Sequence, residues 1–322
     1  MGDLGMGKTR LLEELVARTR AAGGEVLQGR AFEAEGIRPY GVWLEALRRV
    51  PRHAVADHLR TDLALLLPEL GAAALNADRP RLFDAILELV RALTASASAA
   101  RLAVVLDDIQ WMDEASAALL HYVARATEGE AIVLACAARP GELEDNPPAL
   151  AVVRALEREH RLVRLPLTPL SAEETAALAR QIAPGVDGRR VHAESEGNPL
   201  FALELARALS RDEIDASATL GHLVRDRLGA LGEPEQAVLP WASALGRSFE
   251  ASALARVSGL SPPVLIDGLE RLERYGVLRA SQTGGYDFSH DVIRSAAYAR
   301  MSEPRRRLVH IQIARALWQD SA

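Results

Sequence analysis

The spacing of apolar residues changes along the chain, and the change divides it into two parts. In the first part, amphipathic helical stretches alternate with apolar runs that are too short for helices. This pattern favours a parallel sheet with helices on both faces. Helices are predicted over 10–22, 41–50, 55–67, 81–95 and 114–126, and strands over 25–29, 102–106, 131–138 and 162–165.

After Leu170 the short apolar runs stop and helical periodicity takes over. A Gly284-Gly285 turn separates the segments 276–280 and 286–289, which predicts a β-hairpin that follows three helices. That order of elements is typical of a winged helix. The helices predicted in this part cover 171–183, 199–209, 220–231, 233–245, 251–257, 262–275, 291–301 and 303–318.

Composition and charge narrow the class of protein. The chain has 322 residues, enough for two or three domains, and its net charge of −6 argues against a surface built to hold nucleic acid. No apolar stretch reaches the roughly 18 residues that a membrane helix needs. The one cysteine, Cys136, lies in an apolar run and is interpreted as a small core residue. With no disulfide to form and no signal peptide, we expect a cytoplasmic protein without a membrane partner.

The segment Gly2–Thr9 fits the pattern G-x-x-x-x-G-K-[ST] of a phosphate-binding loop. The glycines Gly2, Gly5 and Gly7 let the backbone curl, so that successive N–H groups point at phosphate oxygens. Lys8, the one lysine of the chain, supplies a positive charge to the β- and γ-phosphates, and the Thr9 hydroxyl is a ligand for Mg²⁺. The alternative is a chance match in a glycine-rich tail.

A second motif is the apolar run 102–106, which ends in Asp107 and Asp108. In a parallel sheet, ligands bind at the carboxyl ends of the strands. We expect Asp107 to hold Mg²⁺ and Asp108 to act as the general base on the attacking water. The alternative for the pair is a cap on the following helix.

Arg139 follows the predicted strand 131–138 and is expected at the same edge of the sheet. A fixed cation there could contact the γ-phosphate and stabilise charge in the transition state. The alternative is a solvated arginine after a strand.

These motifs together resemble the STAND class of signal-transduction ATPases, within the AAA-like branch. They look most like the ATPase module of bacterial LuxR-type (MalT-like) transcriptional regulators. The segments that carry the resemblance are GDLGMGKTRLL at 2–12, VLDDIQWMDEAS at 105–116, ARPGE at 138–142, EGNPLFALEL at 196–205 and YDFSHDVIRSAA at 286–297. The resemblance implies ATP or ADP and Mg²⁺ as ligands.

The resemblance also implies two binding residues outside the first part. Pro199 is the position that packs near the adenine, and His290 is the position that reaches the ADP β-phosphate and holds a closed state. A structural histidine is the alternative for His290. The implied organisation is a P-loop α/β domain over 1–169, a helical lid over 170–225, a winged helix over 226–290 and the start of a helical repeat-like region over 291–322.

The chain departs from the family at both ends. The family has a strand ahead of the phosphate loop, and here the first residues are the loop itself, so we expect the first strand of the sheet to be missing. We therefore expect a fragment or a misassigned start, and weakened affinity for ATP. The helical repeats and DNA-reading helix-turn-helix of the family are also absent, and the implied partners are such further domains of a longer parent protein.

The leading functional hypothesis is a regulatory ATPase module of a transcriptional regulator. It would switch between ADP-bound closed and ATP-bound open states with slow hydrolysis, and it could self-associate. The alternative is a truncated, non-enzymatic interaction or scaffold module with degenerate nucleotide binding. A third hypothesis takes the winged helix as a DNA reader, but the acidic charge balance argues against direct DNA binding by this segment.

Overall fold

The structure is a computed structural model, and it describes residues 1–3, 5–32, 38–73, 78–210, 224, 228–281 and 284–319. The chain forms two compact units, Met1–Leu167 and Thr168–Ala322.

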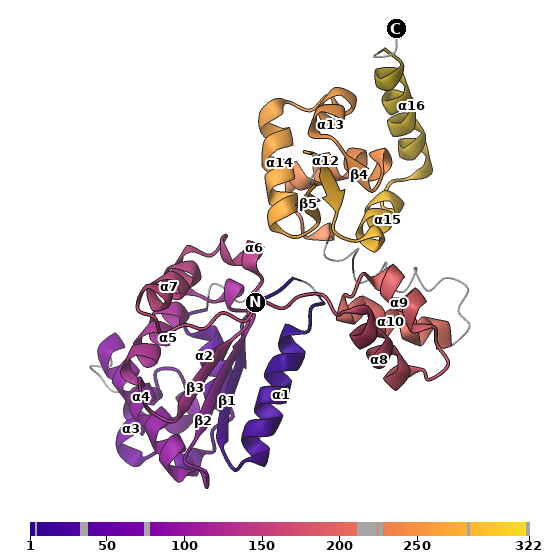
Figure 1. Cartoon of the computed structure of the whole chain (residues 1–322). Helices are drawn as coiled ribbons and strands as arrows, with labels where there is room; N and C mark the ends of the chain where they lie inside the picture. The colour runs from indigo at the N-terminus through magenta and orange to yellow at the C-terminus, as the bar shows by residue number, and fades with distance from the viewer. Residues whose placement is uncertain are drawn as a thin grey trace. The chain divides into compact units, whose positions relative to one another are not determined.

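A parallel three-stranded sheet forms the centre of the first unit (Figure 1). Its strands are β1 (Glu25–Arg30), β2 (Leu102–Asp107) and β3 (Ile132–Cys136), in the order β1-β2-β3. The register pairs Leu27 with Val104, and Val104 with Leu134. Every residue of β2 is buried, as expected for a central parallel strand covered on both faces. The prediction of a parallel sheet with helices on both sides is therefore confirmed for the described residues.

Alternate residues of β2 face opposite layers of helices, because successive side chains of a strand point to opposite faces. Ala103 and Val105 pack against Leu12 and Val16 of α1. Residues on the other face of β2 pack against the remaining helices of the unit, and Figure 1 shows these helices across the sheet from α1. The helices are α1 (Lys8–Ala21), α2 (Gly41–Arg48), α3 (Asp57–Leu63), α4 (Arg79–Ser96), α5 (Glu114–Ala126), α6 (Pro140–Leu143) and α7 (Pro147–Arg158).

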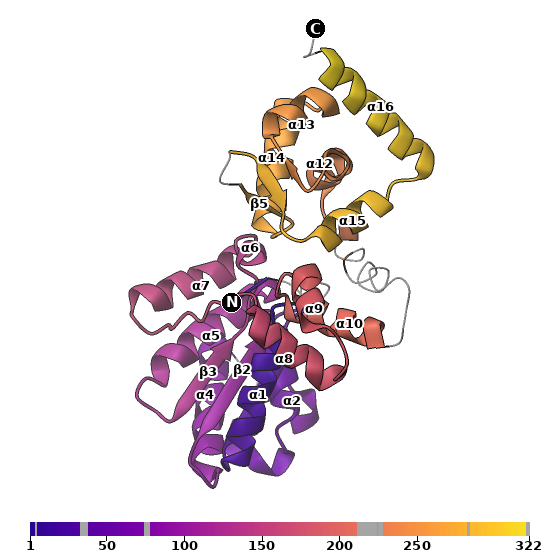
Figure 2. The same cartoon turned by 45° about the vertical axis from the view of Figure 1, so that its right-hand side comes forward.

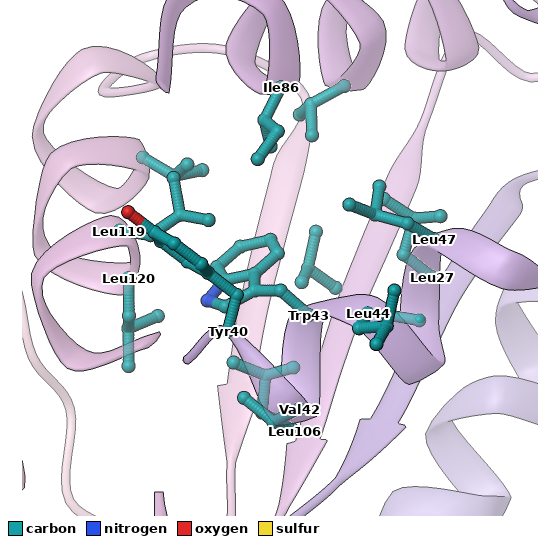
Figure 3. Packing of buried hydrophobic residues seen from close by; sticks show 14 of the residues in the cluster. Leu27, Tyr40, Val42, Trp43, Leu44, Leu47, Ile86, Leu106, Leu119 and Leu120 are labelled. Carbon is teal, nitrogen blue, oxygen red and sulfur yellow. The ribbon is translucent and has the colours of Figure 1, made fainter. Parts of the chain in front are cut away.

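Trp43 of α2 lies at the centre of the larger of these layers (Figure 3). Its side chain is fully buried, and its indole N–H donates to the carbonyl oxygen of Ser116 at 3.1 Å. The bond satisfies the one polar group of the ring, so the indole packs in an apolar layer without an unpaired donor. The contact ties α2 to α5 above the sheet.

The predicted strand over 162–165 is wrong in the described structure: this segment is extended but forms no ladder. Its hydrogen bonds go to the N-terminus of the chain. The Met1 amino group donates to the Leu165 carbonyl at 2.8 Å, and Leu167 N–H donates to the Met1 carbonyl at 2.8 Å. Gly2 N–H donates to the Ala138 carbonyl at 3.3 Å, so Met1 and Gly2 lie between the segment and the end of β3. An apolar run becomes a strand only where a neighbouring strand accepts its hydrogen bonds. Among the described residues β3 pairs on one edge only.

The second unit begins with α8 (Ala172–Ile182), α9 (Gly188–Ser195) and α10 (Pro199–Ser210). These helices share a small core of Ala179, Val191, Ala202 and Leu205. The capping box of α8 is complete, because the Ser171 hydroxyl accepts from Glu174 N–H while the Glu174 carboxylate accepts from Ser171 N–H. The predicted helix over 220–231 falls largely outside the described residues.

The predicted hairpin is present in the second unit as β5 (Leu278–Ala280) and β6 (Tyr286–Phe288) (Figure 2). A short strand, β4 (Ser248–Phe249), pairs with β6, which gives an antiparallel sheet of order β4-β6-β5. The helices of this region are α12 (Glu233–Leu245), α13 (Ala251–Ser258), α14 (Pro262–Arg274), α15 (Asp291–Ala299) and α16 (Glu303–Gln319). No helix in the described part of the chain is both long enough and apolar enough to span a bilayer.

Gly29 of β1 lies close to the backbone of α2. A Cβ added to Gly29 would lie 2.0 Å from the backbone carbonyl oxygen of Val42, and backbone cannot move aside cheaply. We expect Gly29→Ala to lower the free energy of unfolding by about 3 kcal/mol. Urea unfolding followed by circular dichroism measures this change.

Gly41→Ala is the control in the same unit. The nearest non-local atom to its added Cβ is a carboxylate oxygen of Asp113 at 4.0 Å. This variant should be neutral or gain up to about 1 kcal/mol. Equal stability of the two variants would contradict the close approach of α2 to β1.

Candidate functional site

Gly2, Asp3 and residues 5–7 lead into α1, and Lys8 and Thr9 are its first residues, as the sequence motif predicts. Gly5 and Gly7 have φ values of 77° and 87°, a left-handed conformation that L side chains rarely adopt. Gly7 is the N-cap of α1 and offers no side-chain acceptor to the first amides of the helix. A helix N-terminus without a capping side chain or an acidic first turn suits an anionic ligand.

The ammonium group of Lys8 is held over this loop. Its Nζ donates to the carbonyl oxygens of Gly2 at 2.7 Å and Asp3 at 2.8 Å, and only 9% of the residue is exposed. A lysine so far from water needs such acceptors. The two bonds fix the positive charge at the mouth of the loop, where phosphates would lie.

Thr9 and Asp107 are 98 residues apart in sequence and in direct contact: Thr9 Oγ1 donates to Asp107 Oδ2 at 2.7 Å. The packing of α1 on β2 brings them together, because Thr9 lies in the first turn of α1 and Asp107 is the last residue of β2. A hydroxyl and a carboxylate are ligands that suit Mg²⁺. The described residues hold no group of three or more His, Cys, Asp or Glu side chains that could cage a metal. The pair therefore fits an ion that is shared with substrate phosphates.

Asp108 turns the chain at the end of β2 with φ 54° and ψ 43°, a strained conformation for a residue other than glycine. Asp108 is 3% exposed. Asp108 does not cap the following helix. That role belongs to Asp113, whose carboxylate accepts from Ser116 N–H at 2.9 Å at the start of α5. The capping alternative for Asp108 is therefore wrong.

Arg30 is a residue of the site that sequence reasoning missed. Its Nε and Nη2 both donate to Asp108 Oδ2, at 2.9 and 2.7 Å. The hydrogen bonds to Asp108 raise the pKa of the Arg30 guanidinium. The available signal was the position of Arg30 at the end of a strand, since strands β1 and β2 are parallel and Arg30 pairs in register with Asp107.

Arg139 lies just beyond β3, as predicted, and is the N-cap residue of α6. Its Nη1 donates to Glu142 Oε1 at 2.6 Å, and its guanidinium lies 5.1 Å from the centre of the Trp111 ring. Its side chain is 17% exposed, which makes the alternative of a freely solvated arginine wrong. Whether it contacts a γ-phosphate stays a prediction.

Comparisons with known proteins agree with this geometry. Residues 1–134 match the family described as "AAA ATPase domain". This match supports an AAA-like P-loop module in the N-terminal part of the chain. Two solved structures share its fold. One is the Walker-type ATPase PABY2304 of Pyrococcus abyssi, with 17% identity, a TM-score of 0.61 and coverage of 92% of this chain and 89% of that chain. The other is the ORC2 protein of Aeropyrum pernix in ADPNP–ADP complexes, with 16% identity, a TM-score of 0.55 and coverage of 98% and 87%.

A curated relative matches this chain over only part of the relative's own length. Uncharacterized protein R02095 of Rhizobium meliloti is 24% identical to this chain. The match covers 99% of this chain and 34% of the relative, so the chain spans about a third of that protein's length.

Pro199 and His290 belong to the second unit, whereas the phosphate loop belongs to the first. Pro199 is the first residue of α10, and His290 follows β6. The His290 ring meets the Phe201 ring edge-to-face at 5.3 Å, and its Nδ1 lies 3.8 Å from Glu196 Oε2. The structure thus brings His290 to the segment that contains Pro199. Their contacts with a nucleotide stay predictions.

Cys136, the last residue of β3, is partly buried and packs against the larger apolar cluster of the first unit. Burial raises the pKa of its thiol to about 12. Since the thiolate is the reactive form, this favours the structural interpretation over a nucleophile.

This pKa predicts slow alkylation of the folded protein. A free cysteine titrates near pH 8.5, so at pH 8 the Cys136 thiolate should be about a thousandfold rarer than that of a free thiol. We expect iodoacetamide at pH 8 to label the native protein at least about a hundredfold more slowly than the urea-unfolded protein, as measured by mass spectrometry. Equal rates in the two states would contradict the buried-thiol interpretation.

Proposed function

We propose that this chain binds ATP and ADP with Mg²⁺ and hydrolyses ATP slowly. The observation that carries the proposal is the Thr9–Asp107 hydrogen bond of 2.7 Å beside a loop that holds the Lys8 ammonium. The contact joins the two halves of a nucleotide site that are remote in sequence. The fold shared with Walker-type ATPases supports the proposal.

Each residue has a distinct task in this proposal. The amides of the loop and the Lys8 ammonium hold the phosphates, while Thr9 and Asp107 hold Mg²⁺. The ion, when bound, neutralises charge on the phosphates. Asp108 accepts a proton from the attacking water, and Arg139 faces the charge that develops on the γ-phosphate. Arg139 would have to exchange Glu142 for phosphate to do so.

We further propose that the module is a switch in a larger transcriptional regulator of the LuxR-type, STAND-like kind. Support comes from the resemblance of its motifs and from a relative of which this chain spans 34%. In this proposal α12, α13, α14 and the β4-β6-β5 sheet form a winged helix, whose His290 and the neighbouring Pro199 segment respond to ADP. Helical repeats and a DNA-binding domain would lie in other parts of the parent protein.

A second candidate is a non-enzymatic scaffold with degenerate nucleotide binding. The outer edge of β3 favours it, because no described strand pairs there and Val133 is 53% exposed. In this candidate, a phosphate loop beside an unpaired strand edge has low affinity for its ligand. Nucleotide binding by the variants below separates the two candidates.

Lys8→Ala tests the binding site. Loss of a charge-assisted contact should weaken MgATP binding by about tenfold to a hundredfold in calorimetry. Arg10→Ala is the control, because the Arg10 side chain is 76% exposed and pairs with Glu13 and Glu14 on the surface of α1. If Lys8→Ala changed neither the affinity nor the melting temperature in MgATP, the scaffold candidate would replace the nucleotide-binding one.

Asp108→Asn tests the proposed chemistry. The amide keeps the size of the side chain but cannot accept a proton, so phosphate release should fall by about a hundredfold or more. MgATP affinity should change little, because the phosphate loop and the Thr9–Asp107 pair remain. Single-turnover measurement of phosphate release is the assay. An Asp108→Asn variant that hydrolyses ATP at the wild-type rate would rule out this residue as the base.

A further inference from the structure

Gln110 links the two side chains to which catalytic roles are assigned above. It lies in the 3₁₀ turn Ile109–Trp111 and is 3% exposed. Its Nε2 donates to Asp108 Oδ1 at 3.1 Å and approaches Glu142 Oε2 at 3.5 Å. Its Oε1 accepts from the backbone N–H of Arg139 at 3.3 Å. One amide group therefore contacts the end of β2 and the start of α6.

These contacts fix the orientation of the amide. A glutamine amide carries two N–H donors and one carbonyl acceptor. Here the nitrogen faces two carboxylates and the oxygen faces an N–H, so a flipped amide would place an oxygen against Asp108 and Glu142. A buried amide whose groups are matched in this way has one low-energy orientation.

Arg30 hydrogen-bonds one oxygen of the Asp108 carboxylate. Both of its donors meet Oδ2, so these contacts leave Oδ1 to another partner. Gln110 holds the other oxygen, Oδ1. The contacts together engage three of the roughly four acceptor directions of a carboxylate, and the remaining one lies on Oδ1. Gln110 thereby sets the direction in which Asp108 can accept a proton.

The same glutamine acts on Arg139 through two contacts. Its Oε1 holds the Arg139 backbone, and its Nε2 faces Glu142, whose other oxygen accepts from the Arg139 guanidinium at 2.6 Å. The positions of the base and of the cation are thus coupled through one buried side chain.

We propose that Gln110 is a positioning residue for ATP hydrolysis, which aims the Asp108 carboxylate at the attacking water and holds Arg139 at the same edge of the sheet. This inference rests on the proposed ATPase function. Gln110 itself touches neither nucleotide nor water in this proposal. It determines kcat through Asp108 and Arg139, and it leaves nucleotide binding to Lys8, Thr9 and Asp107.

Two variants of Gln110 test the inference. Gln110→Met keeps the length of the side chain without its donors and acceptor. Gln110→Glu keeps the shape and the acceptor but places a third carboxylate beside Asp108 and Glu142. We expect kcat to fall by about tenfold to a hundredfold in Gln110→Met, in the range found for supporting residues of catalytic groups, and at least as far in Gln110→Glu. The KM for MgATP and the affinity for MgADP should stay within about twofold, since the phosphate loop is untouched.

Asn146→Ala is the matched control for a merely structural role. The Asn146 Nδ2 donates to the backbone carbonyls of Gln110 at 2.9 Å and Met112 at 2.8 Å, so it supports the same turn without touching Asp108 or Arg139. This variant should lower the melting temperature and keep kcat within about threefold of wild type.

The outcomes separate the inference from the proposed function. Wild-type protein that releases no phosphate in single-turnover assays would remove the ATPase proposal itself. Wild-type hydrolysis with an undiminished kcat in Gln110→Met or Gln110→Glu would overturn the role of Gln110 alone. An equal fall of kcat in Asn146→Ala would do the same, because it would show that stability of the turn is what matters.

Discussion

The packing of α1 against β2 is the constraint on which the site depends. Leu12 and Val16 of the helix contact Ala103 and Val105 of the strand. This apolar contact fixes the start of α1 beside the end of β2, where Thr9 meets Asp107 at 2.7 Å. Burial of apolar surface supplies the stabilisation, and the polar contact follows from its geometry. Without the packing, the phosphate loop and the acidic pair would be unrelated segments of the chain.

A parallel sheet explains why charged residues collect at one edge. Arg30, Asp107 and Arg139 each come at the end of a strand or just after it, and parallel strands end on the same side. Buried charges at such an edge require partners. Arg30 pairs with Asp108, and Arg139 pairs with Glu142. The groups proposed to be catalytic are therefore already hydrogen-bonded without a ligand, and the proposed role of Arg139 requires it to exchange partners.

In the second unit, too, residues that are far apart in the sequence are in contact. Glu196, in a left-handed conformation with φ 51°, accepts from Arg247 and lies near His290. These contacts connect the segment before α10 with the loops on either side of the short antiparallel sheet. A change in the position of one of these segments would alter its contacts with the others. The proposed switch requires such coupling within this unit.

Local patterns in the sequence predicted most of the helices and strands and most residues of the candidate site. Apolar periodicity predicted the helices and the three strands of the sheet, because a helix or a strand buries its own repeating face. The glycine-lysine loop and the two aspartates predicted a phosphate-binding site. Each motif is recognisable in the sequence because the spacing of residues within it is set by local backbone geometry. The same local reasoning predicted a strand at 162–165, and it was wrong there, because a strand needs a hydrogen-bonding neighbour that lies elsewhere in the chain.

Which side chains of the site are in contact depends on how distant segments of the chain pack. Arg30 lies 78 residues from Asp108, and Glu142 lies 32 residues from Gln110. No local sequence pattern predicts such pairs. In a sequence with 38 basic residues, nothing near an arginine in the sequence shows which acidic residue it will contact. The residues that orient the proposed chemistry depend on contacts between distant segments, and those contacts exist only once the apolar layers have closed.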